Sequence, residues 1–127
     1  MRRARVALLL PILAVAACGS DGDSSGPTTV APPSDVVITA VEGIRWDHDV
    51  YTATSHDGQL VIQGRNESSL GHNLYVVAAD GTQVAEHEDL GTKGESVTER
   101  FDIAPGEYTV ICKIPGHSNM RSSLTVS

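Results

Sequence analysis

Short apolar runs separated by turn-forming residues make up most of the chain after residue 35. The runs are rich in Val, Ile, Thr and Tyr, and Gly, Asn, Asp or Pro stands between them: VVITAV (36–41), VYTAT (50–54), LVIQG (60–64), NLYVVAA (73–79), VTERFDI (97–103), YTVIC (108–112) and SLTVS (123–127). Such runs are typical of β-strands, and no stretch keeps a helical period over the about ten residues that a helix needs. The pattern therefore predicts an all-β sandwich or barrel.

The strand that ends at Cys112 is the one with chemical interest. A period of two places Tyr108, Val110 and Cys112 on one face of it, and we expect this face to be the inner one. The next residues, 113–119, contain Pro and Gly and predict a loop over that end of the sandwich. The polar segment EHEDLGTKGE (86–95) is also expected to be a loop.

The first residues have the order of an export signal. Arg2, Arg3 and Arg5 precede an apolar run of 12 residues, 6–17, which is shorter than the ~18–20 residues of a membrane-spanning helix. The segment VAAC at 15–18 resembles a bacterial lipobox, in which the cysteine is lipidated and becomes the mature N-terminus. We expect a signal peptide at 1–17 and an extracytoplasmic protein anchored to a bacterial membrane by a lipid on Cys18. Ordinary cleavage without lipidation is the alternative.

A linker and one domain are expected after the signal. Residues 18–34 are rich in Gly, Ser and Pro and nearly free of large apolar side chains, so they predict a flexible tether. The remaining 93 residues, 35–127, are enough for one small domain with one core.

The charge of the chain limits its partners. Loss of residues 1–17 would leave 6 basic and 16 acidic residues and move the formal charge from −7 to −10. No basic footprint for nucleic acid is present. An acidic surface favours basic partner proteins, and we expect a monomer.

The segment CKIPGHSNM (112–120) contains a rare combination of side chains. If Cys18 is acylated, Cys112 has no disulfide partner within the chain. A thiolate, the imidazole of His117 and the thioether of Met120 form a soft ligand set that suits copper better than magnesium or calcium. A His₂Cys site with an axial Met needs a second histidine, and His72, at the start of a predicted strand, is a plausible one.

Three segments, GHN (71–73), PGEYTVIC (105–112) and PGH (115–117), resemble the blue-copper cupredoxins, the family of azurin, plastocyanin and amicyanin. The resemblance implies an antiparallel Greek-key sandwich with one type 1 copper that cycles between Cu(I) and Cu(II). It implies equatorial ligands at His72, Cys112 and His117 and an axial ligand at Met120. In the same family pattern the Gly71 carbonyl lies toward the metal, and the Asn73 side chain ties the two ligand loops together.

The resemblance also implies a function. Four filled ligand positions leave none for a substrate, which favours electron transfer between redox partner proteins over enzyme activity. Electrons would leave through the edge of His117, with Leu70, Ile114 and Pro115 as a candidate apolar ring.

Three alternatives remain at this level. The first is an extracytoplasmic copper-binding or delivery protein, and the second is a metal-free sandwich in which Cys112 fills the core. The third, a catalytic cysteine–histidine pair, fits an inward-facing thiol poorly. The other histidines (His48, His56 and His87) have acidic or polar neighbours, so solvated positions are expected. His87, between Glu86 and Glu88, could take up adventitious metal.

Overall fold

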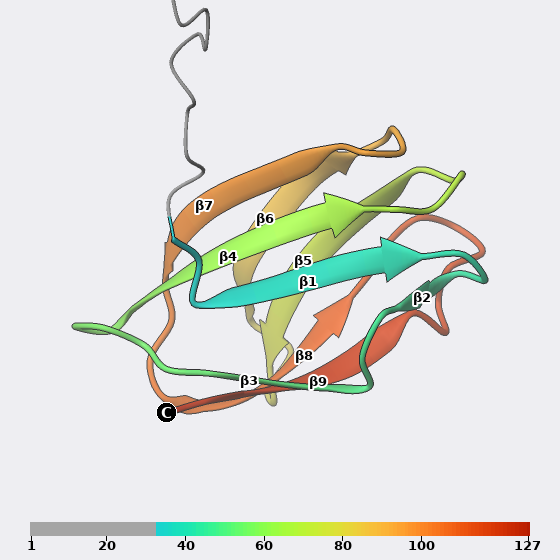
Figure 1. Cartoon of the computed structure of the whole chain (residues 1–127). Helices are drawn as coiled ribbons and strands as arrows, with labels where there is room; N and C mark the ends of the chain where they lie inside the picture. Colours follow the sequence, from blue (N-terminus) through green and yellow to red (C-terminus); the bar gives the residue numbers. More distant parts are fainter. Residues whose placement is uncertain (1–32) are drawn as a thin grey trace, which may run out of the picture. The chain divides into compact units, whose positions relative to one another are not determined.

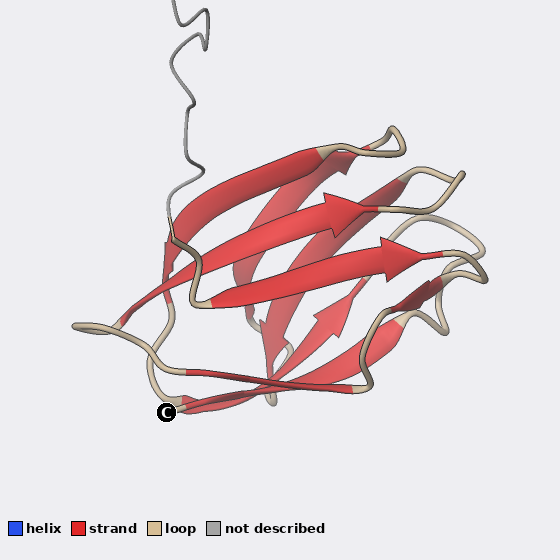
Figure 2. Cartoon of the chain, viewed as in Figure 1, coloured by secondary structure: helices blue, strands red, loops and turns tan. Residues whose placement is uncertain are grey.

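The structure, a computed structural model of the 127-residue chain, describes residues 33–127. The predicted signal peptide, Cys18 and the linker up to residue 32 lie outside the described residues. Strands and loops account for the whole described part (Figure 2), which contains no helix long and apolar enough to span a bilayer. The strands are β1 (Val36–Val41), β2 (Arg45–Trp46), β3 (Val50–Ala53), β4 (Gln59–Asn66), β5 (His72–Ala78), β6 (Gln83–Leu90), β7 (Ser96–Asp102), β8 (Gly106–Ile111) and β9 (Arg121–Val126).

The strands form two facing sheets (Figure 1). One sheet has the order β2-β1-β4-β7 and the other the order β3-β9-β8-β5-β6. The predicted all-β sandwich is therefore confirmed. Two pairs, β1 with β4 and β3 with β9, are parallel, so the sheets are mixed, whereas the family resemblance implied an antiparallel arrangement.

Alternating side chains build the core between the sheets. On β4, Leu60 and Ile62 are fully buried, and on β5, Leu74 and Val76 are fully buried. Each of these pairs is separated by one residue, as a strand with one face on the core requires. Apolar residues at a period of two thus supply most of the free energy of burial that holds the two layers together.

Strand β6 corrects the sequence-based expectation. The segment 86–95 was expected to be a loop, but its first five residues belong to β6, at the edge of the five-stranded sheet. An edge strand of a sandwich needs apolar side chains on one face only. Here Ala85 and Leu90 supply that face, while most of the strand sequence is polar.

The arrangement of β5 and β8 sets the position of the candidate ligands. These strands are antiparallel neighbours, with Tyr75 opposite Ile111. The first residue of β5 and the residue after β8 therefore lie at the same end of the sheet. His72 begins β5 and Cys112 follows β8, so two distant parts of the sequence meet there.

Candidate metal centre

Three buried side chains converge at this end of the sandwich. One ligand atom each from His72, Cys112 and His117 lies within 4.8 Å of the other two. His72 is 2% exposed, Cys112 5% and His117 8%. Among residues 33–127, this is the one group of His, Cys, Asp and Glu side chains with such spacing. Three donors this close can contact one common ion.

The loop after β8 holds Cys112, His117 and Met120 through two successive turns. The His117 amide donates to the Ile114 carbonyl at 3.0 Å, and the Met120 amide donates to the His117 carbonyl at 2.9 Å. Gly116 has φ 91°, which fits a Pro-Gly pair at the centre of the first turn because glycine tolerates positive φ without strain. The Cys112 amide closes the loop on the Met120 carbonyl at 3.3 Å.

Met120 is brought to the base of the same loop. Its side chain is 1% exposed, and its backbone faces that of Cys112 through the closing hydrogen bond. The inward-facing thiol and the loop over it agree with the alternation expected for 108–112. The loop thus supplies two soft sulfur donors and one imidazole from nine residues.

His72 is in a form that can bind a metal ion. Neither Nδ1 nor Nε2 of His72 makes a hydrogen bond within the described residues, although both atoms are buried. Burial lowers the pKa of His72, the His117 imidazole acts in the same direction, and the Glu42 carboxylate opposes them. The neutral imidazole, which has a free lone pair, is therefore favoured. Buried nitrogens without partners are expected where a metal ion belongs.

Contacts between the donors are close. The Cys112 Sγ lies 3.6 Å from the His117 Nδ1, and the ring centroids of His72 and His117 are 5.0 Å apart. Two imidazoles, a thiol that can ionise and a thioether fit copper by their chemistry. In the part of the chain that the structure describes, Cys112 is a free cysteine.

Asn73 and Gly71, the residues on either side of His72, hold the backbone in two different ways. The Asn73 Oδ1 accepts a hydrogen bond from the Lys113 amide at 2.7 Å, which joins the start of β5 to the loop after β8. Gly71 lies against the backbone of Gly91, and a Cβ on Gly71 would be 3.3 Å from the Gly91 carbonyl oxygen. The bond and the close approach both fix the backbone on either side of His72.

Asn66 and Glu42 support the same loop and were not singled out from the sequence. The fully buried Asn66 donates from Nδ2 to the carbonyls of Leu70 (2.8 Å) and Leu90 (2.7 Å). Its Oδ1 accepts from the Ser68 amide at 2.8 Å, a local turn for which Asn at a strand end is a sequence signal. Glu42 accepts from the Ser69 amide at 2.7 Å and from its hydroxyl at 3.0 Å.

The remaining sequence-predicted residues fall into two groups. Leu70 is 45% exposed, Pro115 is exposed and Ile114 is half-buried, so all three reach the surface of the ligand-bearing loops. His48 and His56 are exposed as expected. His87 is 1% exposed, and the expected solvated position is therefore wrong. Its burial follows from the alternation of β6, in which His87 lies two residues after the buried Ala85 and pairs with the buried Leu74.

The chain is similar to known copper proteins in sequence and in fold. A family model described as "Copper binding proteins, plastocyanin/azurin family" matches residues 32–127. No curated protein matches the sequence.

Several solved structures are similar. Dithionite-reduced auracyanin from Roseiflexus castenholzii is 21% identical, with 75% of this chain and 98% of that chain covered and a TM-score of 0.63. Auracyanin A, a blue copper protein from Chloroflexus aurantiacus, is 25% identical (72% and 97% covered, TM-score 0.59). An azurin from Methylomonas sp. strain J is 15% identical (74% and 98% covered, TM-score 0.60).

Proposed function

The chain belongs to the plastocyanin/azurin family of copper-binding proteins, and from this premise we propose that it carries single electrons between redox partners. The observation that supports this proposal most directly is the convergence of His72, Cys112 and His117 within 4.8 Å beside the buried Met120. This donor set fits one type 1 copper ion, which supplies the one-electron Cu(I)/Cu(II) couple when bound.

In this proposal, each donor has a separate role. His72, Cys112 and His117 would hold the copper ion, and the thioether of Met120 would be a weaker fourth donor that tunes its reduction potential. The Asn73 bond to Lys113 holds the two ligand loops together. Because the turns of the loop and the two sheets fix the donors, their positions change little between oxidation states. A small rearrangement favours rapid electron transfer.

His117 is the proposed point of electron exchange. It is 8% exposed, whereas His72 is 2% exposed and lies deeper. The exposed Leu70 and Pro115 and the half-buried Ile114 lie on the ligand-bearing loops, where apolar surface allows close approach of a partner without costly desolvation. No ligand position is left for a substrate, which favours a carrier over an enzyme.

The proposal also includes a location for the protein and a class of redox partner. The lipobox-like segment at 15–18 supports lipidation of Cys18 and attachment to the outer face of a bacterial membrane. The acidic composition supports redox partners with basic surfaces. Mass measurement of the membrane-extracted protein beside Cys18→Ala tests the anchor. An unchanged mass and unchanged membrane association in the variant would refute it.

The central experiment is reconstitution with Cu(II), followed by visible absorption and electron paramagnetic resonance. We expect an intense thiolate-to-copper charge-transfer band and a narrow copper hyperfine splitting. Cys112→Ser should abolish the band, and Met120→Leu should shift it. His56→Gln, at an exposed histidine, is the control and should leave the spectrum unchanged. A pale spectrum that is insensitive to Cys112→Ser would contradict the proposal.

A further inference from the structure

His87 is a buried histidine that the copper site does not use. Its side chain has no exposed surface, and neither ring nitrogen makes a hydrogen bond within the described residues. Buried polar groups without partners are rare, because loss of hydration without a new hydrogen bond costs free energy. The position of His87 therefore calls for a ligand or another explanation.

His87 faces the interior because it lies two residues after the buried Ala85 and pairs with the buried Leu74 of β5, and a bulge follows it in β6. Leu74 pairs with His87, and His72 pairs with Leu90, so three steps along β6 match two steps along β5. The extra residue changes the alternation, and both His87 and Leu90 face the core.

The interior has space for the His87 ring. At Gly64 of β4, an added Cβ would lie 3.4 Å from the His87 Cδ2 and 3.3 Å from a Leu90 methyl group. The Phe101 ring contacts the imidazole edge-on, with a centroid separation of 5.1 Å. Carbon atoms of the ring thus pack against the core, and both ring nitrogens are buried without a hydrogen bond.

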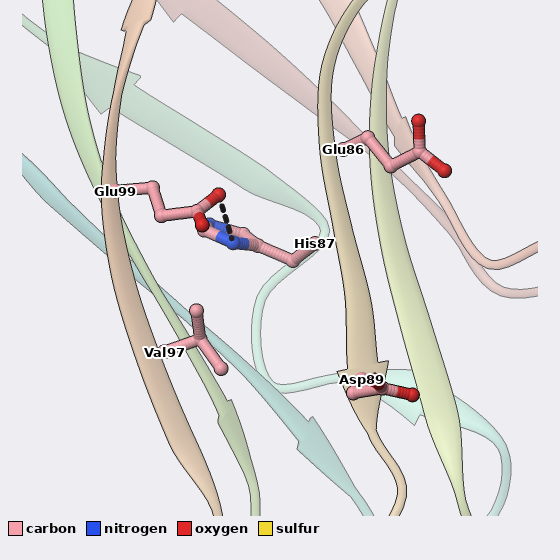
Figure 3. A pocket seen from close by; sticks show the side chains of 5 residues that line it. All are labelled: Glu86, His87, Asp89, Val97 and Glu99. Atoms are coloured by element: carbon pink, nitrogen blue, oxygen red, sulfur yellow. Dashed lines mark ion pairs between the residues drawn. The ribbon is translucent and has the colours of Figure 1, made fainter.

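A surface cavity of about 420 Å³ adjoins the imidazole. Its lining consists of Glu86, His87 and Asp89 from β6 and Val97 and Glu99 from β7 (Figure 3). The His87 side chain extends from β6 toward Glu99 on β7, with Nδ1 3.4 Å from the Glu99 Oε2. The cavity thus offers one imidazole nitrogen and one facing carboxylate, with room for water.

We propose that His87 and Glu99 are the protein ligands of a second metal site, which binds a divalent ion such as Zn²⁺ between β6 and β7. Bonds of about 2.0–2.2 Å at a tetrahedral angle place two ligand atoms about 3.4 Å apart. The Nδ1 and Oε2 atoms are already 3.4 Å apart, but Oε2 lies outside the hydrogen-bonding direction of Nδ1, so the Glu99 carboxylate must rotate before both atoms can bind one ion. Water in the cavity completes the coordination.

The surrounding charges favour a cation at this place. Burial lowers the pKa of His87, and the nearby Glu99 carboxylate opposes this only in part, so the neutral imidazole, which keeps a lone pair, is favoured. Glu86 and Asp89 also line the cavity, but their side chains extend from β6 away from His87 (Figure 3). The Glu86 carboxylate accepts hydrogen bonds from Tyr75 and Gln83, both at 2.9 Å, so Glu99 is the carboxylate that faces the imidazole. An imidazole and a carboxylate suit Zn²⁺ better than they suit Cu(I), which prefers sulfur.

Glu99 provides access to the site. Its side chain is 52% exposed, so the carboxylate can turn into the plane of the imidazole without disturbing the core. An ion can therefore enter from solvent through movement of one surface side chain, while His87 stays fixed between the sheets.

The test is a zinc titration of the protein loaded with Cu(I), so that the copper ligands are already occupied. Calorimetry should show saturable binding of one Zn²⁺, and nuclear magnetic resonance should show shifts of the His87 ring signals. Glu99→Gln should weaken binding at least about tenfold, and His87→Gln should abolish it. Because Glu99 is exposed, its variant is expected to fold normally.

His56→Gln is the matched control. His56 also faces a carboxylate, with its Nε2 3.5 Å from the Asp35 Oδ1, but it lies on the surface with 73% of its side chain exposed. Zinc affinity should be unchanged in this variant. The proposal is overturned if the protein shows no saturable zinc binding, or if the affinity is the same in Glu99→Gln. Loss of binding in His56→Gln would equally overturn it.

Discussion

Gly71 and Gly91 touch each other, but only one of them lacks room for a side chain. A Cβ on Gly71 would meet the backbone of Gly91 at 3.3 Å, whereas a Cβ on Gly91 has nothing within 4 Å. A backbone atom cannot rotate away as a side chain can, so Gly71→Ala must displace the residues around it. The residue that follows is His72.

The two glycines therefore give a matched pair of variants. We expect Gly71→Ala to shift the copper charge-transfer band and to lower stability by about 1–3 kcal/mol through overpacking. Gly91→Ala should leave the spectrum unchanged and alter stability by less than about 0.5 kcal/mol. Absorption spectra and denaturant unfolding measure both effects. Equal spectra for the two variants would contradict the assigned contact.

At the level of single residues, the sequence identifies candidate metal ligands more readily than it identifies the residues that hold those ligands in place. Cys112, His117 and Met120 are chemically distinctive and close in sequence, and the structure brings Cys112 and His117 together with His72. Asn66 acts through hydrogen bonds to backbone groups up to 24 residues away. Which carbonyls an amide will meet depends on how the strands pack, and the residue type alone does not contain that information.

Strand β6 shows a secondary-structure element that the sequence pattern does not predict. The apolar runs predicted β1, β3, β4, β5, β7, β8 and β9 because each alternates or stays apolar over several residues. β6 has the sequence QVAEHEDL, and its bulge interrupts the period of two. A polar edge strand with an irregular register has the same local pattern as a loop, so only pairing with β5 distinguishes them.

The burial of His87 makes the stability of the folded protein depend on pH. The unfolded-state pKa of a histidine is 6.5, and burial lowers the pKa of His87 in the folded protein. Below pH 6.5 the unfolded chain therefore binds more protons than the folded chain at this residue. Its contribution to stability is fully present above that pH and is lost as pH falls toward the folded-state pKa.

Metal-free wild-type protein should thus lose stability between pH 7.5 and pH 5 more steeply than His87→Leu. One proton limits the difference in slope to about 1.4 kcal/mol per pH unit. Denaturant unfolding at several pH values measures both slopes, and the contributions of all titratable groups that the two proteins share cancel in the comparison. Parallel slopes for the two proteins would show that His87 does not titrate in this range.

The net charge of the protein affects how fast it reacts with charged redox partners. The formal charge of the chain is −7, and exposed charges are screened by salt over about 8–10 Å. Oxidation of the copper-loaded protein by a cationic metal complex should slow as ionic strength rises, and oxidation by an anionic complex should accelerate. Stopped-flow rate constants provide the measurement. The opposite signs would argue against basic redox partners.

Both ends of the described chain lie at one end of the sandwich, and the loop between β8 and β9, which carries proposed copper ligands, lies at the other (Figure 1). Val126 pairs with Gly106 at the start of β8, whereas Arg121 pairs with Ile111 next to Cys112. The five steps along β8 correspond to about 16 Å. Electron tunnelling falls steeply with distance, so rigid attachment at either end of the described domain would insulate the copper from the supporting surface. A protein immobilised in this way should discharge to dissolved partners and exchange electrons only slowly with the electrode beneath it.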